Sequence, residues 1–194
     1  MAEDRRVRRT QKLLEEALIE VALEKGYKNI TIHDVTNRAD VGYRTYFRHF
    51  TGLDELLVRV AQDRLDHFYE ILNIPPREVI EENPVDYFHV LGEALFKHVQ
   101  QHEQAFRFLL QDSGSRFVLR PVVERARQKV EVLLQQYSGA PIPTELAANH
   151  IITSIFSLMR WWLENDMPHS PPKMGEIFTD LIVKPTWLVM TGDG

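Results

Sequence analysis

The sequence predicts an all-α protein. Along its 194 residues apolar side chains recur at the spacing of one helix face, and no stretch alternates apolar and polar residues as a half-buried strand would. Proline, glycine and asparagine stand at the breaks between these stretches, where helices begin and end. With 44% hydrophobic and 26% charged residues, the chain can bury the core of one or two small domains.

The first predicted helix ends near Gly26. Its apolar stripe consists of Leu14, Leu18, Val21 and Ala22. Four arginines precede the stripe: Arg5, Arg6, Arg8 and Arg9. A short basic arm of this kind can enter a minor groove or lie along phosphates, and a frayed charged terminus is the alternative interpretation.

Residues 31 to 39 predict a short second helix. Thr31 is a good N-cap, and Asp34 can reach back to complete a capping box. Val35 and Ala39 then follow at roughly the helical period, so the helix runs from about Ile32 to Ala39. After it, Asp40 stands where the chain must turn, because Gly, Asn and Asp adopt left-handed backbone conformations more readily than other residues.

The next predicted helix, about Tyr43 to Phe50, presents two different sides. On a helical wheel Tyr46 and Phe50 face the core, which directs Arg44 and Arg48 outward. Arginine forks match guanine in the major groove, and flanking hydroxyls and imidazoles can reach bases or phosphates. The pattern therefore predicts a helix-turn-helix that reads DNA, whereas a charged solvated helix is the alternative. The predicted DNA-binding residues are His33, Tyr43, Arg44, Thr45, Phe47, Arg48 and His49.

This segment resembles the TetR family of bacterial transcriptional regulators. The resemblance covers about a quarter of the chain, and the matching positions are Gly26-Tyr27, Ile30-Thr31-Ile32, Asp34-Val35, Arg38-Ala39, Val41, Thr45, Arg48-His49-Phe50 and Asp54-Glu55-Leu56-Leu57. It implies an N-terminal three-helix helix-turn-helix domain, residues 1–52, and a C-terminal helical effector-binding and dimerisation domain, residues 53–194. It further implies a homodimer that binds near-palindromic double-stranded operator DNA and releases it when a small molecule binds.

The chain departs from the family pattern at Asp40, Gly42, Tyr46-Phe47 and Leu53. Three of these departures bear on phosphate contacts that the resemblance implies. Gly42 has no hydroxyl, Phe47 lacks a phenol oxygen, and Leu53 has no ammonium group.

Composition and charge limit the class of protein further. There is no cysteine, which excludes a disulfide framework and a thiolate metal site. The N-terminal segment has no apolar signal core and no run approaches a membrane span, so we expect a cytoplasmic protein without membrane contact. Of the net charge of −5, residues 1–50 hold +2, with 10 Lys and Arg against 8 Asp and Glu, and the remainder holds −7, with 13 against 20. This asymmetry favours a nucleic-acid surface near the N-terminus.

Beyond Leu53 the pattern predicts one helix after another. The first runs from about Asp54 to Leu72 and stops at Pro75-Pro76. Asn83 is a predicted N-cap with Pro84 at the first helical position. A shorter helix containing Phe106, Leu109 and Leu110 ends near Ser113-Gly114-Ser115.

The remaining proline, glycine and capping residues predict three more helices. Pro121 is expected to open a helix that runs to about Tyr137, and residues 138–143 have the composition of a linker. Thr144 is the predicted cap of the next helix. Ser170 and Pro171 are expected to start the last helix, which should kink or end where Pro185 removes a hydrogen-bond donor.

Two late helices, residues 144–165 and 171–190, carry heavy apolar stripes. A four-helix interface across a two-fold axis is the simplest use of such a pair, and burial of both stripes inside one chain is the alternative. The predicted dimer contacts are Ile151, Ile155, Leu158, Met159, Trp162, Ile177, Phe178 and Leu181.

The resemblance also implies an effector pocket in the helices behind the DNA-binding domain, and we expect a small apolar or aromatic ligand. The candidate lining residues are Leu65, Phe68, Phe88, Phe106 and Phe117, for each of which plain core is the alternative. His98 and His102 are spaced to share a helix face, but no third metal ligand is placed beside them, so we expect no metal and no cofactor.

An enzyme is the rival class of function. The sequence contains no G-x-S-x-G elbow, no phosphate-binding glycine loop, no dinucleotide fingerprint and no H-E-x-x-H motif, so we do not expect catalysis. A second alternative is an all-α dimer that binds DNA constitutively and has no effector.

Overall fold

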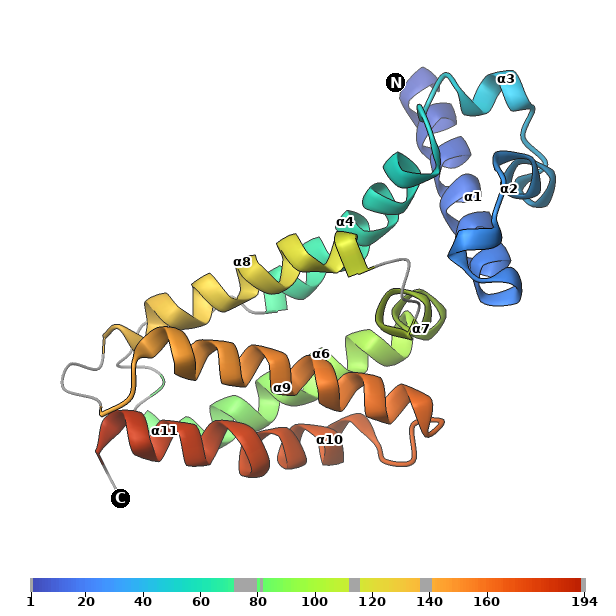
Figure 1. The fold of residues 1–194 in the computed structure, drawn as a ribbon. Helices are drawn as coiled ribbons and strands as arrows, with labels where there is room; N and C mark the ends of the chain where they lie inside the picture. The colour runs from blue at the N-terminus through green and yellow to red at the C-terminus, as the bar shows by residue number, and fades with distance from the viewer. Residues whose placement is uncertain (1, 72–79, 81, 112–115, 137–140, 193–194) are drawn as a thin grey trace. The chain divides into compact units, whose positions relative to one another are not determined.

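A computed structural model describes residues 2–71, 80, 82–111, 116–136 and 141–192 (Figure 1). The side chains of residues 2–4, 63–69, 111, 116–118 and 122 lie outside this description. All regular secondary structure in the described ranges is helical, which confirms the predicted fold class. Within the same ranges, no helix combines the length and the apolar character that a membrane crossing requires.

The chain forms two compact units, which are described one at a time. The N-terminal unit comprises Met1–Leu65 and Gln104–Leu119, and the C-terminal unit comprises Asp66–Glu103 and Arg120–Gly194. The predicted domain limits, 1–52 and 53–194, divide the chain by function and stay a prediction.

The N-terminal unit is built around a long first helix. It contains α1 (Ala2–Lys25), the short 3₁₀ helix η1 (Tyr27–Asn29), α2 (Ile32–Ala39), α3 (Tyr43–Tyr46), the start of α4 (Leu53–Ile71) and most of α7 (Glu103–Gln111). The predicted stripe of α1 is buried, and α2 packs against this helix. The core of this unit includes Leu14, Leu18, Val21, Ala22, Val35, Ala39, Tyr46, Phe50, Leu56, Leu57 and Val60.

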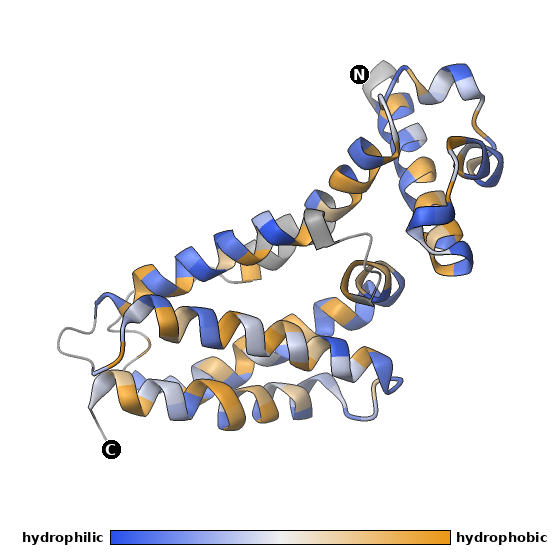
Figure 2. Cartoon of the chain, viewed as in Figure 1, coloured by the Kyte–Doolittle hydropathy of each residue, from blue (hydrophilic) through white to orange (hydrophobic). Residues whose placement is uncertain are grey.

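The C-terminal unit is a layered helical bundle. Its helices are α6 (Pro84–Gln101), the greater part of α8 (Arg116–Leu134), α9 (Thr144–Glu164), α10 (Pro171–Phe178), the π-helical turn η3 (Thr179–Val183) and α11 (Lys184–Thr191). Helix α9 runs antiparallel to the α10–α11 segment (Figure 1). Apolar and polar residues alternate along both segments with helical spacing (Figure 2), as expected for helices that bury one side.

Two glycines allow α6 and α10 to touch through their backbones. A Cβ atom on Gly175 would lie 2.6 Å from the nitrogen of Glu93 and 2.7 Å from the carbonyl oxygen of His89. A Cβ on Gly92 would lie 2.8 Å from the Cα of Gly175. Only residues without a side chain fit at this crossing, so Gly92 and Gly175 fix the distance between the two helices.

Several predicted helix ends are confirmed. The Asn83 side chain caps α6 by accepting from the backbone N–H of Asp86, with Pro84 in the first turn. The Ser170 hydroxyl likewise accepts from the backbone N–H of Lys173 at the start of α10. The last helix is interrupted before Pro185, where the π-helical turn η3 separates α10 from α11.

Two predicted helix starts are wrong. Helix α8 begins at Arg116 and contains Pro121 in its interior, where the proline removes one intrahelical hydrogen bond without ending the helix. Helix α9 is capped by Pro143, whose carbonyl oxygen accepts from the N–H groups of Leu146 and Ala147, so Thr144 is already helical. The predicted breaks at Pro75-Pro76 and at residues 113–115 lie outside the described residues, as do residues 138–140 of the predicted linker.

Candidate nucleic-acid interface

The first helix of the predicted helix-turn-helix is held by the predicted capping box. The backbone N–H of Asp34 donates to the Thr31 hydroxyl at 3.2 Å, and the backbone N–H of Thr31 donates to the Asp34 carboxylate at 2.9 Å. The Lys25 ammonium of α1 donates to the same carboxylate at 2.6 Å. Lys25 and the two Thr31 groups together hold the pKa of Asp34 well below its usual range. This cluster ties the start of α2 to the end of α1.

The turn that follows α2 has the predicted left-handed residue. Asp40 adopts φ 51° and ψ 43°, and its backbone N–H donates to carbonyls of the last helical turn. Gly42 then caps α3 without a side-chain hydrogen bond, because it has no side chain to offer. The backbone N–H of Thr45 donates to the Gly42 carbonyl at 2.8 Å, so α3 begins at the residue directly after Gly42.

The second helix of the predicted helix-turn-helix, residues 43–50, is called the reading segment below, and its α-helical part is shorter than predicted. As an α-helix, α3 spans only Tyr43–Tyr46, whereas the prediction extended it to Phe50. The backbone continues in tighter turns, since the N–H groups of Arg48 and His49 donate to carbonyls three residues earlier. The helical path therefore persists to Phe50 although its hydrogen bonds change.

The predicted division of this segment into two sides is confirmed. Tyr46 and Phe50 are buried, and Arg44 and Arg48 are exposed. Burial raises the pKa of the Tyr46 phenol to about 12, and the Glu55 carboxylate adds to this effect. The core thus fixes the side of the segment on which both guanidinium groups lie.

The other predicted DNA-binding residues lie around these arginines. Tyr43 and Phe47 are exposed, Thr45 and His49 are half-buried, and His33 is exposed on α2. The ring of Phe47 meets the rings of Tyr43 and Tyr46 at centroid distances of 5.1 and 5.4 Å. No predicted DNA-binding residue has its side chain in the core.

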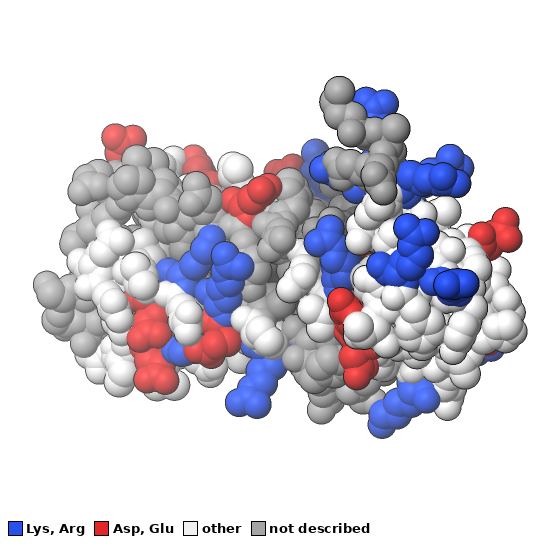
Figure 3. Space-filling view, turned by 90° about the horizontal axis from the view of Figure 1, so that it is seen from above, with Lys and Arg blue, Asp and Glu red and all other residues white. Residues whose placement is uncertain are grey.

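The ion pairs found among the described residues of the N-terminal unit do not include Arg44 or Arg48. Arg38 pairs with Glu20 at 3.0 Å and with Glu24 at 2.7 Å, and Arg59 lies 3.6 Å from the carboxylate of the buried Glu15. The side chains of Arg44 and Arg48 make no hydrogen bond or ion pair with another described residue. Figure 3 shows Lys and Arg side chains gathered on the face of the N-terminal helices that the view presents. The charges of Arg44 and Arg48 are thus available to an outside partner.

The predicted basic arm is not an arm in this structure. Arg5, Arg6, Arg8 and Arg9 lie within the first turns of α1, which begins at Ala2. All four are exposed. Helix α1 thus includes the arginines that precede its apolar stripe, because arginine and glutamate favour helix even where no apolar stripe is present.

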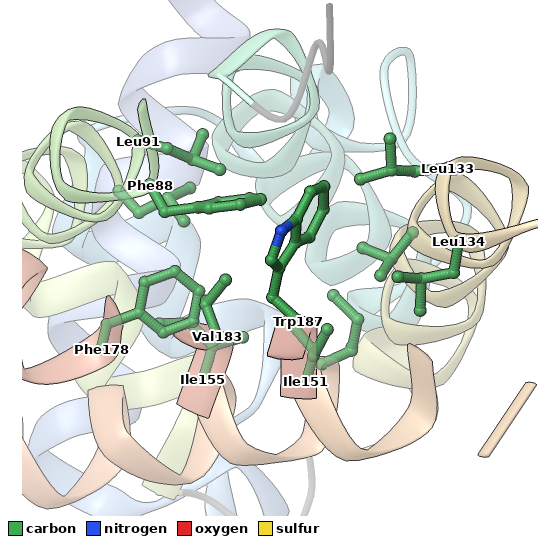
Figure 4. A pocket seen from close by; sticks show the side chains of 12 residues that line it. Phe88, Leu91, Leu133, Leu134, Ile151, Ile155, Phe178, Val183 and Trp187 are labelled. Atoms are coloured by element: carbon green, nitrogen blue, oxygen red, sulfur yellow. The ribbon is translucent and has the colours of Figure 1, made fainter. Parts of the chain in front are cut away.

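The C-terminal unit contains an apolar cavity of about 40 Å³ (Figure 4). Its walls come from α6, α8, α9, α10, η3 and α11, and the lining residues are Phe88, Leu91, Leu95, Val130, Leu133, Leu134, Ile151, Ile152, Ile155, Phe178, Val183 and Trp187. Every one of these side chains is a hydrocarbon or an indole. The rings of Phe88 and Trp187 meet edge to face at 5.4 Å inside it.

Among the predicted pocket residues, Phe88 lines this cavity. Phe106 is buried in the N-terminal unit and does not line this cavity, so its place in an effector pocket stays a prediction. A buried aromatic residue has the same sequence signature in a core as in a cavity wall. The side chains of Leu65, Phe68 and Phe117 lie outside the described residues.

The predicted dimer contacts separate into two groups. Ile155, Met159, Trp162 and Phe178 are buried within a single chain and offer no surface to a partner, which corrects their assignment. Helices α9 and α10 bury the predicted apolar stripes against the other helices of the same bundle. Leu181 is 65% exposed, and Ile151, Leu158 and Ile177 are partly exposed.

The described residues contain no group of three histidine or carboxylate side chains able to hold a metal ion. His98 and His102 lie close, with ring centroids 4.7 Å apart.

The fold and this site define a helical protein with an N-terminal helix-turn-helix. Residues 89–184 match the TetR-type family described as "Transcriptional regulator C-terminal region". Among curated proteins, the chain is 26% identical over 182 residues to an HTH-type transcriptional regulator of Bacillus subtilis (strain 168), YxbF, a match that covers 92% of this chain and 46% of the relative. The chain thus spans about half the length of that relative.

Solved structures share the fold over nearly the whole chain. A TetR transcriptional regulator from Streptococcus agalactiae 2603V aligns with a TM-score of 0.68 at 20% identity, covering 94% of this chain and 98% of that one. The fatty acid degradation regulator FadR from Bacillus halodurans aligns with a TM-score of 0.69 at 15% identity, covering 89% of this chain and 93% of that one. The family match to residues 89–184 and the curated relative support a TetR-family transcriptional regulator, and the solved structures show that the chain shares the fold of such regulators.

Proposed function

We propose that the chain is a bacterial DNA-binding transcriptional regulator that reads operator DNA with Arg44 and Arg48. The observation that carries this proposal is the state of these two guanidiniums. Both are exposed on one side of the reading segment, and neither is paired with another described residue. Arg38, in contrast, pairs with the carboxylates of Glu20 and Glu24 and so links α2 to α1.

The chemistry of the surrounding side chains fits double-stranded DNA. A guanidinium can donate two parallel hydrogen bonds to O6 and N7 of guanine in the major groove. Tyr43 and His49 flank the arginines, where a phenol or an imidazole can donate to phosphates and fix the register. His33 on α2 is exposed, and its imidazole can donate to a phosphate of the DNA backbone in the same way. A protein that works on bacterial DNA acts in the cytoplasm.

A homodimer would place two such segments on one operator. Leu181 and Leu188 of the α10–α11 segment are 65% and 38% exposed, and Trp161 of α9 is 44% exposed. Leu158 and Ile177 contribute partly exposed apolar surface on the same two elements. Two copies of this face would form the proposed four-helix interface.

The DNA proposal is tested by selecting genomic fragments that the protein retains and measuring the affinity for the best of them. Arg44→Ala and Arg48→Ala should each lose about 5- to 150-fold for the selected operator, the cost of a lost bidentate contact. Lys97→Ala, which removes the same charge from an exposed position of α6, is the matched control and should stay within about twofold of the parent. Retention of no fragment above background, or equal affinity for all duplexes, would overturn the proposal.

We further propose that a small, uncharged apolar or aromatic effector enters the cavity of Figure 4 and releases the DNA. No lining side chain carries a charge to pair with an ionised ligand. A shift of a two-state protein from 1:99 to 99:1 needs about 5.5 kcal/mol of differential affinity, which corresponds to roughly 220 Å² of apolar area buried only in the DNA-free state. The cavity of about 40 Å³ is too small for such a ligand, so Phe88 and Trp187 would have to move apart.

The effector proposal is tested by screening neutral apolar compounds, together with charged analogues, for release of the operator. Phe88→Leu should change the half-releasing concentration of an active compound by about tenfold. Phe96→Leu is the matched control, because Phe96 is buried on the same helix and does not line the cavity. If no compound releases the operator, the small volume of the cavity favours the alternative of a constitutive DNA-binding dimer.

A further inference from the structure

The reading segment exposes two aromatic rings beside its two arginines. Tyr43 is 55% exposed and Phe47 is 46% exposed, and their ring centroids lie 5.1 Å apart at an interplanar angle of 66°. The ring of Phe47 also rests against that of Tyr46, which is wholly buried. Phe47 is therefore held in place from below and from one side while its remaining surface faces outward.

The two kinds of side chain form one continuous face. On a regular helix, residues 43, 47, 44 and 48 follow one another within an arc of about 140°. The aromatic rings occupy one half of this arc, and the guanidiniums occupy the other half. Whatever Arg44 and Arg48 contact, the rings of Tyr43 and Phe47 must lie against a neighbouring part of the same partner.

The chemistry of the rings limits what that part can be. Phe47 has no donor, so it gains nothing from a phosphate oxygen, and its burial against a charged group would be unfavourable. In the major groove the apolar group on a base edge is the C5 methyl of thymine. Positive charge on one half of the face complements the phosphates and guanine acceptors of the same duplex.

We propose that Phe47, held by Tyr43 and Tyr46, is a specificity-determining residue that contacts a thymine methyl group in each half of the operator. This inference rests on the proposed DNA-binding function and extends it to a second kind of base readout. It predicts operator half-sites in which a thymine lies next to the guanine that an arginine contacts.

The test replaces thymines by deoxyuridine, one at a time, in a selected operator. This change removes only the methyl group and leaves base pairing intact. Burial of one methyl group corresponds to about a fourfold change in affinity, so one thymine in each half-site should show a loss of about that size with the parent protein. With Phe47→Ala, the same deoxyuridine should cost nothing further, because the contact has already been removed.

Two control variants separate this role from others. Tyr43→Phe keeps the ring and loses the hydroxyl, so it should retain the response to deoxyuridine. Arg44→Ala should bind more weakly overall and also retain it. Because Phe47 is exposed, Phe47→Ala should keep the parent's circular dichroism, and Phe47→Leu provides a second, apolar variant with a partial response.

The outcomes are distinct. If the parent binds its operator but no deoxyuridine weakens binding, or if Phe47→Ala still responds to deoxyuridine as the parent does, the thymine contact is overturned and the proposed function stands. If the parent prefers no duplex at all, the proposed function fails, and this inference fails with it.

Discussion

The backbone crossing of α6 and α10 gives the sharpest prediction about stability, through Gly175→Ala. The added methyl group would lie 2.6 Å from the nitrogen of Glu93, about 0.8 Å closer than the 3.4 Å at which ordinary contacts begin. Its second neighbour, the carbonyl oxygen of His89 at 2.7 Å, is also backbone, so no side chain can rotate away to relieve the overlap. The two helices would have to separate.

Overpacking of a well-packed interior costs about 1 to 3 kcal/mol, and the rigid neighbours here place Gly175→Ala at the upper end. For a protein of this size, about 3 kcal/mol lowers the melting temperature by roughly 6 to 12 °C. The assay is thermal unfolding followed by circular dichroism at 222 nm. Gly52→Ala is the control, because a Cβ there meets nothing within 4 Å. A Gly175→Ala protein that melts within about 2 °C of the parent would refute the backbone contact between α6 and α10.

Three further predictions concern assembly, acid stability and the start of the reading segment. Leu181→Glu should give monomers by sedimentation. Val132→Glu, a change at an exposed apolar position of α8, should leave the dimer intact. If the Leu181→Glu protein is still a dimer, Leu181 does not lie in the dimer interface. Because the pKa of Asp34 is lowered on folding, its stabilising effect is present above its unfolded pKa of about 3.9 and is lost as the pH falls. Asp34→Asn should therefore melt below the parent at pH 7 and approach it in acid, and a constant difference at all pH values would contradict this linkage. Gly42→Ser meets only the Thr45 hydroxyl, at 3.7 Å, and should raise stability by a few tenths of a kcal/mol in denaturant titrations by capping α3; a loss of stability would contradict the cap.

The elements that the sequence predicted best are those whose signals are local. The capping box of Thr31 and Asp34 has both partners within three positions, and the left-handed Asp40 is a property of one residue. The outward orientation of Arg44 and Arg48 followed because Tyr46 and Phe50 identify the buried side of the segment. These features needed no knowledge of the rest of the chain.

Features that depend on distant residues were predicted less well or were missed. The crossing of Gly92 and Gly175 joins helices far apart in the chain, and neither glycine carries a signal of it. Apolar periodicity identified the stripes of α9 and α10, but it could not separate Ile155 and Met159, which the bundle buries, from Leu181, which it leaves exposed. The cavity likewise takes its walls from six helical segments, so Phe88 could be proposed from sequence whereas Trp187 could not.

The central claim is that Arg44 and Arg48 read guanine bases in duplex DNA, and one substitution in the DNA tests it most directly. Replacing single guanines of the selected operator by 7-deazaguanine removes the N7 acceptor and preserves base pairing. The parent should lose affinity at one guanine or more in each half-site, within the 1 to 3 kcal/mol or so that a bidentate contact contributes. The variant that lacks the matching arginine should lose nothing further at that guanine. If every guanine can be replaced without loss, or if Arg44→Ala and Arg48→Ala weaken all duplexes equally, these arginines contact phosphates and do not read the sequence.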